Sequence, residues 1–115
     1  MNHMTVYLKN KVLTDNLRTL PVFVALFVGD TEVSATGYVR QPVVFATPTD
    51  GQTSNDVEIL FPIATENWGD ISHIGISDAS TGGNLLFKSQ AEFTKNIDVS
   101  SQYKIPKNYL IVRLR

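Results

Sequence analysis

The chain of 115 residues carries 10 Lys and Arg against 11 Asp and Glu, a formal net charge of −1, and 43% of its residues are hydrophobic. This length suits one domain with one buried core, and the composition is that of a globular rather than a disordered protein. The near-zero charge excludes the broad basic field that holds nucleic-acid phosphates, so nucleic acid is not an expected partner.

The first predicted element is a helix over residues 5–17, because this stretch contains neither Gly nor Pro. Its apolar residues spread over a broad arc, which suits a segment packed between two surfaces. The second surface is either this chain or a neighbouring subunit. The arc contains Leu13 and Leu17 together with two interface candidates, Leu8 and Val12.

Residues 21–28 are predicted to form the first strand, and they are apolar on both faces. A strand of this kind must be covered twice. One cover is the opposing sheet, and the other is either the amino-terminal helix or a neighbouring subunit. Phe23 and Phe27 lie on the second face and are therefore interface candidates.

Residues 38–45 are predicted as the next strand, although Arg40, Gln41 and Pro42 interrupt its apolar run. Proline cannot donate to a ladder, so Pro42 indicates a sheet edge or a bulge. The amide of Gln41 is well placed to bond the carbonyl that Pro42 leaves without a donor, or one beside it.

Alternation along this strand turns Val39 and Val43 toward the core and leaves Tyr38, Arg40 and Pro42 on the outer face. Arginine and tyrosine are favoured anchors where one subunit meets another, which makes these three residues interface candidates. The alternative is an ordinary solvated strand face.

On that outer face, Arg40 is expected to stack on Tyr38 or to pair with Glu32 or Glu58. Exposed pairs within one subunit contribute little to stability. The sequence therefore predicts that Arg40→Ala weakens association and hardly changes the stability of a single subunit.

Short apolar segments then alternate with turn residues at a spacing typical of sandwiches and barrels. One side of each segment is predicted to face the core, and the glycine-bearing residues 78–83 are predicted as a hairpin loop. The inward residues are Val57, Ile59 and Phe61 in residues 56–61, Ile74 and Ile76 in residues 71–77, Leu85, Phe87, Ala91 and Phe93 in residues 84–93, and Leu110, Val112 and Leu114 in residues 109–114; residues 97–99 and 103–105 form two further short segments.

Together these elements predict a mainly β protein, an antiparallel β-sandwich of about eight strands after one short helix. A flattened barrel and a jelly-roll arrangement are the alternatives within this class. Residues 1–115 form one domain, with a helical segment at 1–20 and the sandwich at 21–115. The predicted core residues are Phe61, Trp68, Ile74, Ile76 and Phe87.

No group of residues with a known catalytic or metal-binding spacing occurs in the chain, so no enzyme activity and no cofactor is expected. There is no cysteine, and His73 is predicted on the outer face of a strand. Glu66 and Asp70 flank Trp68, which admits a sugar cleft with two carboxylates. The favoured interpretation is that Trp68 is buried as a plug and the acids are solvated.

The longest apolar run, residues 22–28, is far shorter than the about 20 residues that a membrane-spanning helix needs, so no membrane partner is expected. The amino-terminal residues also lack the apolar region of a signal peptide. We expect a protein that acts inside the cell that makes it or leaves that cell by a route other than secretion.

Three segments in order resemble a family of small tailed-bacteriophage virion proteins usually labelled "phage tail fibre protein". They are residues 31–41 (TEVSATGYVRQ), 61–79 (FPIATENWGDISHIGISDA) and 81–86 (TGGNLL). The likeness covers roughly residues 20–115. The chain departs from the family at Ala35 and Thr36, where relatives often carry glycines, so the loop before Tyr38 is expected to follow a different course.

This resemblance implies a non-enzymatic structural protein of the virion that is made in the host cytoplasm. The leading interpretation is a capsid decoration or cement protein, a dimer or trimer that binds the major capsid protein. The alternative is a structural module of the tail fibre or tail tip, or a receptor-binding module in which Trp68, Tyr38 or Tyr103 stacks on sugar rings. A hydrolase that uses Glu66 and Asp70 is a third hypothesis.

Overall fold

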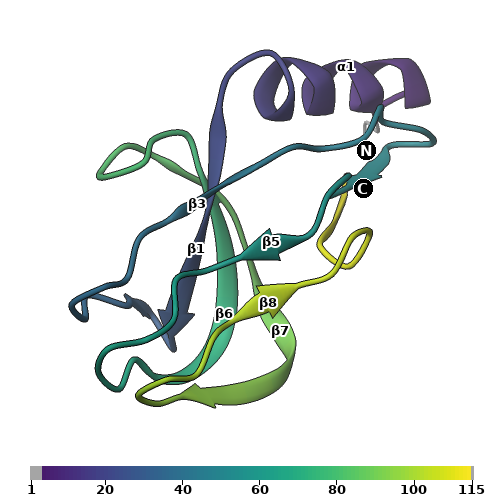
Figure 1. Cartoon of the computed structure of the whole chain (residues 1–115). Coiled ribbons are helices and arrows are strands. Elements are labelled where there is room, and N and C mark those ends of the chain that lie inside the picture. The colour runs from purple at the N-terminus through teal and green to yellow at the C-terminus, as the bar shows by residue number, and fades with distance from the viewer. Residues whose placement is uncertain (1–3, 115) are drawn as a thin grey trace.

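A computed structural model describes residues 4–114 of the chain. Over these residues it contains one helix and nine strands, and every strand pair is antiparallel, which confirms the predicted fold class (Figure 1). The elements are α1 (Val6–Leu17), β1 (Val22–Val28), β2 (Thr31–Glu32), β3 (Gln41–Val43), β4 (Gln52–Ser54), β5 (Ile59–Leu60), β6 (Gly69–Ser77), β7 (Leu85–Ile97), β8 (Lys104–Ile105) and β9 (Ile111–Arg113).

Helix α1 begins at its N-cap Thr5, whose side-chain oxygen accepts a hydrogen bond from the Leu8 amide at 3.2 Å. Only one face of the helix is buried, through Leu13 and Leu17. The helix lies across one end of the sandwich beside β4, and there Asn10 accepts a hydrogen bond from the backbone amide of Gly51 at 2.9 Å (Figure 1).

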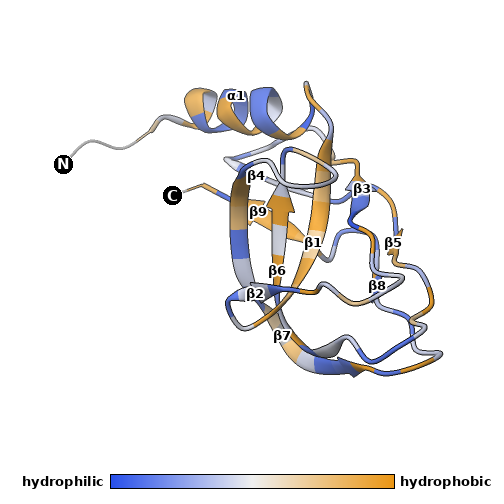
Figure 2. Cartoon of the chain, turned by 90° about the vertical axis from the view of Figure 1, so that its left-hand side faces the viewer, coloured by the Kyte–Doolittle hydropathy of each residue, from blue (hydrophilic) through white to orange (hydrophobic). Residues whose placement is uncertain are grey.

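The main sheet has the order β2-β1-β6-β7, with β3 beside β1 on the same side as β2. Strand β1 is hydrophobic along its length and lies next to β6 (Figure 2). Val24 pairs with Ile76 and Leu26 with Ile74, so the inner faces of both strands form one side of the core.

The outer face of β1 is covered in part by the sheet to which it belongs. Gly75 lies opposite Ala25, and a Cβ on this glycine would lie 2.7 Å from the ring of Phe27 and 2.8 Å from Leu85. Because Gly75 has no side chain, Phe27 and Leu85 can occupy the space above it on this face of the sheet. The Lys88 ammonium lies 4.6 Å from the centre of the Phe27 ring, and Phe27 is only 8% exposed.

Strand β7 departs from simple alternation, and the prediction that Leu85, Phe87, Ala91 and Phe93 share an inward side is wrong. The register shifts between Ile76 and its neighbour Ser77, so Leu85 lies opposite Ser77 while Phe87 lies opposite Ile76. Because of this bulge, Leu85 and Phe87, which are two positions apart and would share a face in a regular strand, lie on opposite faces. A second irregularity follows further along β7, and the side chain of Phe93 is 73% exposed.

Two short two-stranded sheets, β4–β9 and β5–β8, face the main sheet and complete the sandwich. We call them, with the segments that connect them, the cover layer. Strand β4 was not predicted, the strand expected at residues 56–61 shrinks to β5, and Val57 is 50% exposed rather than inward. The buried side chains of the cover layer include Phe45, Ile59, Phe61, Tyr103, Ile105, Leu110 and Val112.

Candidate functional site

The predicted outward positions of Tyr38 and Arg40 are wrong. Residues 34–40 are not a strand, because the chain turns at Gly37, which has a φ of +87°. The Tyr38 ring stacks on Phe61 at a centroid distance of 6.2 Å and meets Trp68 edge to face at 5.5 Å. Val39, predicted to face the core, is 54% exposed.

The hydroxyl group of Tyr38 fills a gap in the main sheet. Strand β1 pairs with β3 up to Val24 and with β2 from Phe27, so the amide of Leu26 has no strand partner on that side. This amide donates to the Tyr38 oxygen at 3.0 Å, and the hydroxyl donates to Glu32 at 2.7 Å. Burial raises the pKa of Tyr38, so the hydroxyl keeps its proton at physiological pH.

The guanidinium group of Arg40 makes a two-pronged ion pair with Glu32. Its Nε lies 2.7 Å from Oε2 and its Nη2 lies 2.8 Å from Oε1. Both side chains are largely buried, with 13% of Arg40 and 27% of Glu32 exposed. The hydrogen bonds from Arg40 lower the pKa of the Glu32 carboxyl group, and the same pairing raises the pKa of Arg40.

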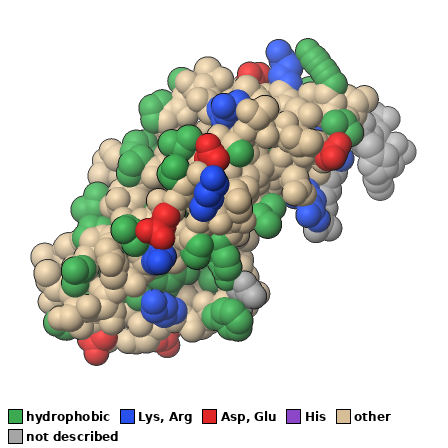
Figure 3. Space-filling model, turned by 45° about the vertical axis from the view of Figure 1, so that its right-hand side comes forward, with side chains coloured by type: hydrophobic (Ala, Val, Ile, Leu, Met, Phe, Trp, Pro, Cys, Tyr) green, Lys and Arg blue, Asp and Glu red, His purple; other side chains and the backbone are tan. Residues whose placement is uncertain are grey.

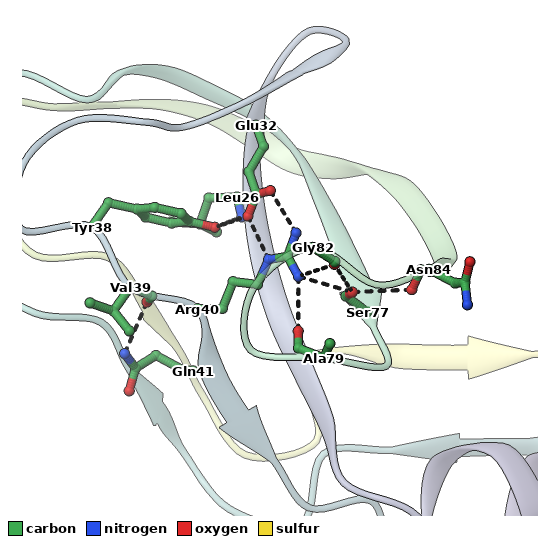
Figure 4. A network of polar contacts seen from close by, with 10 residues as sticks. All are labelled: Leu26, Glu32, Tyr38, Val39, Arg40, Gln41, Ser77, Ala79, Gly82 and Asn84. Atoms are coloured by element: carbon green, nitrogen blue, oxygen red, sulfur yellow. Dashed lines mark hydrogen bonds and ion pairs between the residues drawn. The ribbon is translucent and has the colours of Figure 1, made fainter.

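The remaining nitrogen of Arg40, Nη1, holds the hairpin that joins β6 to β7 (Figure 4). It donates to the Ser77 hydroxyl at 3.0 Å and to the carbonyl oxygens of Ala79 at 2.8 Å and Gly82 at 2.9 Å. The Ser77 hydroxyl in turn donates to the carbonyl of Asn84 at 3.1 Å. Arg40 therefore ties β2 to the β6–β7 hairpin from inside one subunit.

We call this group the Arg40 clamp; it consists of Glu32, Tyr38, Arg40, Ser77 and the carbonyls of the hairpin loop. Each guanidinium nitrogen of Arg40 already donates a hydrogen bond within the chain. Nothing in the group is arranged as a nucleophile beside a base, so its chemistry is that of a structural tie.

Pro42 lies on β3, which pairs only with β1 among the described strands and so is an edge of the main sheet. The proline sits opposite Phe23, is exposed, and needs no donor on its open side. The side-chain amide of Gln41 donates to the carbonyl of Val39 at 3.0 Å. Gln41 thus bonds a carbonyl close to the proline.

Trp68 is buried between the layers, with 4% of its surface exposed, and its indole nitrogen has no hydrogen-bond partner among the described residues. The neighbouring acids hold loops: Glu66 accepts from the Thr36 amide at 2.6 Å and Asp70 accepts from the Asn96 amide group at 2.8 Å. Because its ring is buried, Trp68 is not the floor of an open cleft between these two acids.

Neither Trp68 nor Tyr103, which is 8% exposed, offers a ring face to a sugar, and the hydroxyl of Tyr38 is committed to the Arg40 clamp. This burial argues against sugar stacking on these three rings. His73 is half-buried and its Nδ1 lies 2.8 Å from the Ser72 hydroxyl. Within residues 4–114, no three His, Asp or Glu side chains gather as metal ligands, and no helix could span a membrane.

The interface candidates do not form a single surface. Tyr38 and Arg40 point inward, Phe27 is buried, Phe23 and Val12 are half-buried, and Leu8 and Pro42 are exposed. On the face drawn in Figure 3, exposed hydrophobic side chains lie among charged ones at several places. The exposed residues that sequence reasoning did not single out as exposed include Tyr7, Leu20, Val28, Ile63 and Val99.

A family model described as "Podophage GP4 fiber I protein gp80" matches residues 3–113. The match includes α1 and all nine strands, together with every residue of the Arg40 clamp. The resemblance to phage tail fibre proteins is thereby confirmed. No curated protein matches the chain.

Proposed function

The chain belongs to the Podophage GP4 fiber I protein gp80 family, and on that premise we propose that it is a non-enzymatic part of the phage tail fibre or its attachment. Membership makes it a fibre-related structural protein and a component of the virion. In this proposal the protein binds other virion proteins, including further copies of itself.

The observation that carries the proposal is the match over residues 3–113, which leaves almost no part of the chain outside the family. The absence of enzyme activity is supported by the use of the polar groups that were candidates for chemistry. Arg40 and Glu32 are paired with each other, and Glu66 and Asp70 hold the backbone or side chains of neighbouring loops.

A place in the fibre is favoured over capsid decoration because the family is described by a fibre protein. The cement interpretation drew on the apolar outer face of β1 as a surface that needs a neighbouring subunit. Phe27 on that face is covered by Lys88 and Leu85 of its own sheet, which weakens the argument for a capsid contact there.

The test is to count and locate the protein in purified virions. We expect quantitative mass spectrometry to give far fewer copies than the major capsid protein, and gold-labelled antibody to mark the tail in electron micrographs. Copies comparable with the major capsid protein and label over the capsid would support decoration instead. Complete absence from mature virions would overturn the structural role.

A further inference from the structure

The two ends of the molecule differ in structure. Figures 1 and 2 place α1 at one end and the turns at the opposite end. We call the first the helical end, which comprises α1 with residues 18–20, the loop at 47–51 and the end of β9. We call the second the turn end, which comprises the β1–β2 turn, residues 62–70 and residues 95–102. The molecule is elongated, with extents of 46 × 26 × 25 Å.

The charges at the two ends are opposite in sign among the described residues. At the helical end Lys9, Lys11, Arg18 and Arg113 outnumber Asp15 and Asp50, whereas at the turn end Asp30, Glu66, Asp70 and Asp98 outnumber Lys95. Lys88 reaches Asp30 at 3.4 Å, but the Asp30 side chain remains fully exposed. Each end is therefore complementary to the other and repels a second copy of itself.

Both ends also expose hydrophobic side chains. At the helical end Tyr7 is 66% exposed and Leu20 is 63% exposed. At the turn end Val28, Ile63 and Val99 are 40%, 59% and 58% exposed. A contact between the two ends would remove apolar surface from water on both sides, in addition to pairing the charges.

We propose that copies of this chain stack end to end, with the helical end of one copy against the turn end of the next. The proposal rests on the structural role proposed above. The occupant of each end is a second copy because its opposite end carries the complementary charge, whereas pairing of like ends would bring like charges together. A head-to-tail contact of this kind is heterologous, so it continues along a row or closes into a ring.

The cross-section of 26 by 25 Å limits the strength of the contact. It allows roughly 600 Å² per partner, which is at the low end for a specific interface. Stacking is therefore expected to be weak, dependent on concentration, and weakened by salt because much of the attraction is between exposed charges.

Sedimentation velocity at increasing protein concentration tests the proposal. We expect association at about 0.05 M salt that is lost by about 0.5 M salt. Two charge-reversed variants sharpen it: Lys11→Glu with Arg18→Glu at the helical end, and Asp30→Lys with Asp70→Lys at the turn end. Each variant alone is expected to associate at least about tenfold more weakly, since both of its ends then carry the same sign.

Mixing the two variants gives the decisive measurement. One variant then has two negative ends and the other has two positive ends, so the mixture is expected to associate although neither variant does so alone. Lys107→Glu, on the β8–β9 loop, changes a residue that belongs to neither end; it is the control and should leave association unchanged. Thermal melts of every variant check that it is folded.

A wild-type chain that stays monomeric at low salt, variants that associate as the wild type does, or a mixture that remains monomeric would each overturn end-to-end stacking. These outcomes are separate from the virion measurement. A chain that is present in the tail but does not stack would overturn this inference alone, whereas a chain that stacks but is missing from virions would overturn the proposed function.

Discussion

Strands β1, β6 and β7 of the main sheet run for 7, 9 and 13 residues, whereas the strands of the cover layer run for only two or three. Long ladders satisfy most of the backbone of the main sheet, and the Leu26 amide, which donates to the Tyr38 hydroxyl, is an exception. The ladders of the cover layer are short, and its backbone is satisfied also by hydrogen bonds between its connecting segments and by the buried side chain of Asn55. The comparison shows that one sandwich can hold its two layers by different means.

Asn55 is the main tie of the cover layer, and it is fully buried. Its amide nitrogen donates to the carbonyls of Val57 at 2.8 Å and Pro106 at 2.9 Å, and its oxygen accepts from the Leu110 amide at 2.8 Å. One side chain thereby joins the segments before β5, after β8 and before β9. Gln102, which is exposed, adds one bond of this kind and donates to the carbonyl of Phe61 at 2.7 Å.

The contact between the two layers is broken most severely by Trp68→Ala. Trp68 is buried between them and packs against Tyr38. We expect the free energy of unfolding to fall by about 3–5 kcal/mol, because the change leaves a cavity that the surroundings fill only in part. Denaturant unfolding measures it. The control is Trp68→Phe, which keeps a ring and removes a nitrogen with no partner among the described residues. Equal losses for the two variants would show that the ring is not the anchor.

Asn55→Ala tests the cover layer alone. It leaves the buried Leu110 amide without its acceptor, removes one donor from each of the Val57 and Pro106 carbonyls, and empties the fully buried site of the side chain, so we expect a loss of roughly 2–4 kcal/mol in the free energy of unfolding. The matched control is Asn96→Ala on β7, where the side chain is exposed and bonds the exposed Asp70. That variant should lose less than about 0.5 kcal/mol. Similar losses in both layers would contradict the difference between them.

The same difference explains which elements could be predicted from the sequence. Helix α1, strand β1 and strand β6 follow from their apolar residues and from the Gly and Pro residues near their boundaries. Strand β4 consists of Gln52, Thr53 and Ser54 and has no apolar pattern to reveal it. It is a strand because β9 pairs with it, and no local signal records such a long-range contact.

The Arg40 clamp was predicted only in part. Glu32 was named as a partner for Arg40, and that pairing is present. The predicted outward direction of Tyr38 and Arg40 was wrong. The prediction extended the alternation of the strand from Val43 back through residues 38–40, but these residues lie outside the strand and follow the turn at Gly37. Side-chain direction outside a ladder is set by tertiary contacts, here by the ring of Phe61 beside Tyr38.

Within the main sheet, Arg40→Ala tests whether side chains matter where ladders are long. The expectation from sequence was little loss of stability, but the structure predicts a loss of about 2–3 kcal/mol, because Glu32 and three oxygens of the β6–β7 hairpin region lose a largely buried donor. Urea unfolding at neutral pH measures it. Arg40→Lys keeps the positive charge but not the planar guanidinium group that makes the two-pronged pair, so it should recover only part of the lost stability.

The effect of Arg40→Ala should depend on pH in one direction. The folded pKa of Glu32 is lowered from its ordinary value of 4.5, chiefly by its hydrogen bonds with Arg40. Stability from this pair is therefore fully present above about pH 4.5 and is lost as the pH falls through the lowered value. The difference between wild type and variant should shrink on acidification. A constant difference down to pH values below that range would show that Glu32 does not carry the effect.

Tyr38→Phe removes one hydroxyl and leaves the ring contacts with Phe61 and Trp68 in place. The Leu26 amide would lose its acceptor at the gap between β2 and β3, so we expect a loss of about 1–2 kcal/mol. Hydrogen exchange by NMR provides the specific readout: the Leu26 amide should exchange faster while the amides of β6 change little. Uniform acceleration across the sheet would instead indicate global destabilisation.

The smallest effect is expected for Lys104→Ala, which breaks an ion pair at the surface of the cover layer. Lys104 lies 3.2 Å from Glu58, but the two side chains are 56% and 43% exposed, so water already solvates both charges well. We expect a change below about 0.5 kcal/mol in the free energy of unfolding, further reduced at high salt. The cover layer then depends on its buried amides and aromatic rings, and not on its surface charges. A loss for Lys104→Ala as large as that for Asn55→Ala would contradict this ordering, because it would mean that exposed pairs replace the missing ladder bonds.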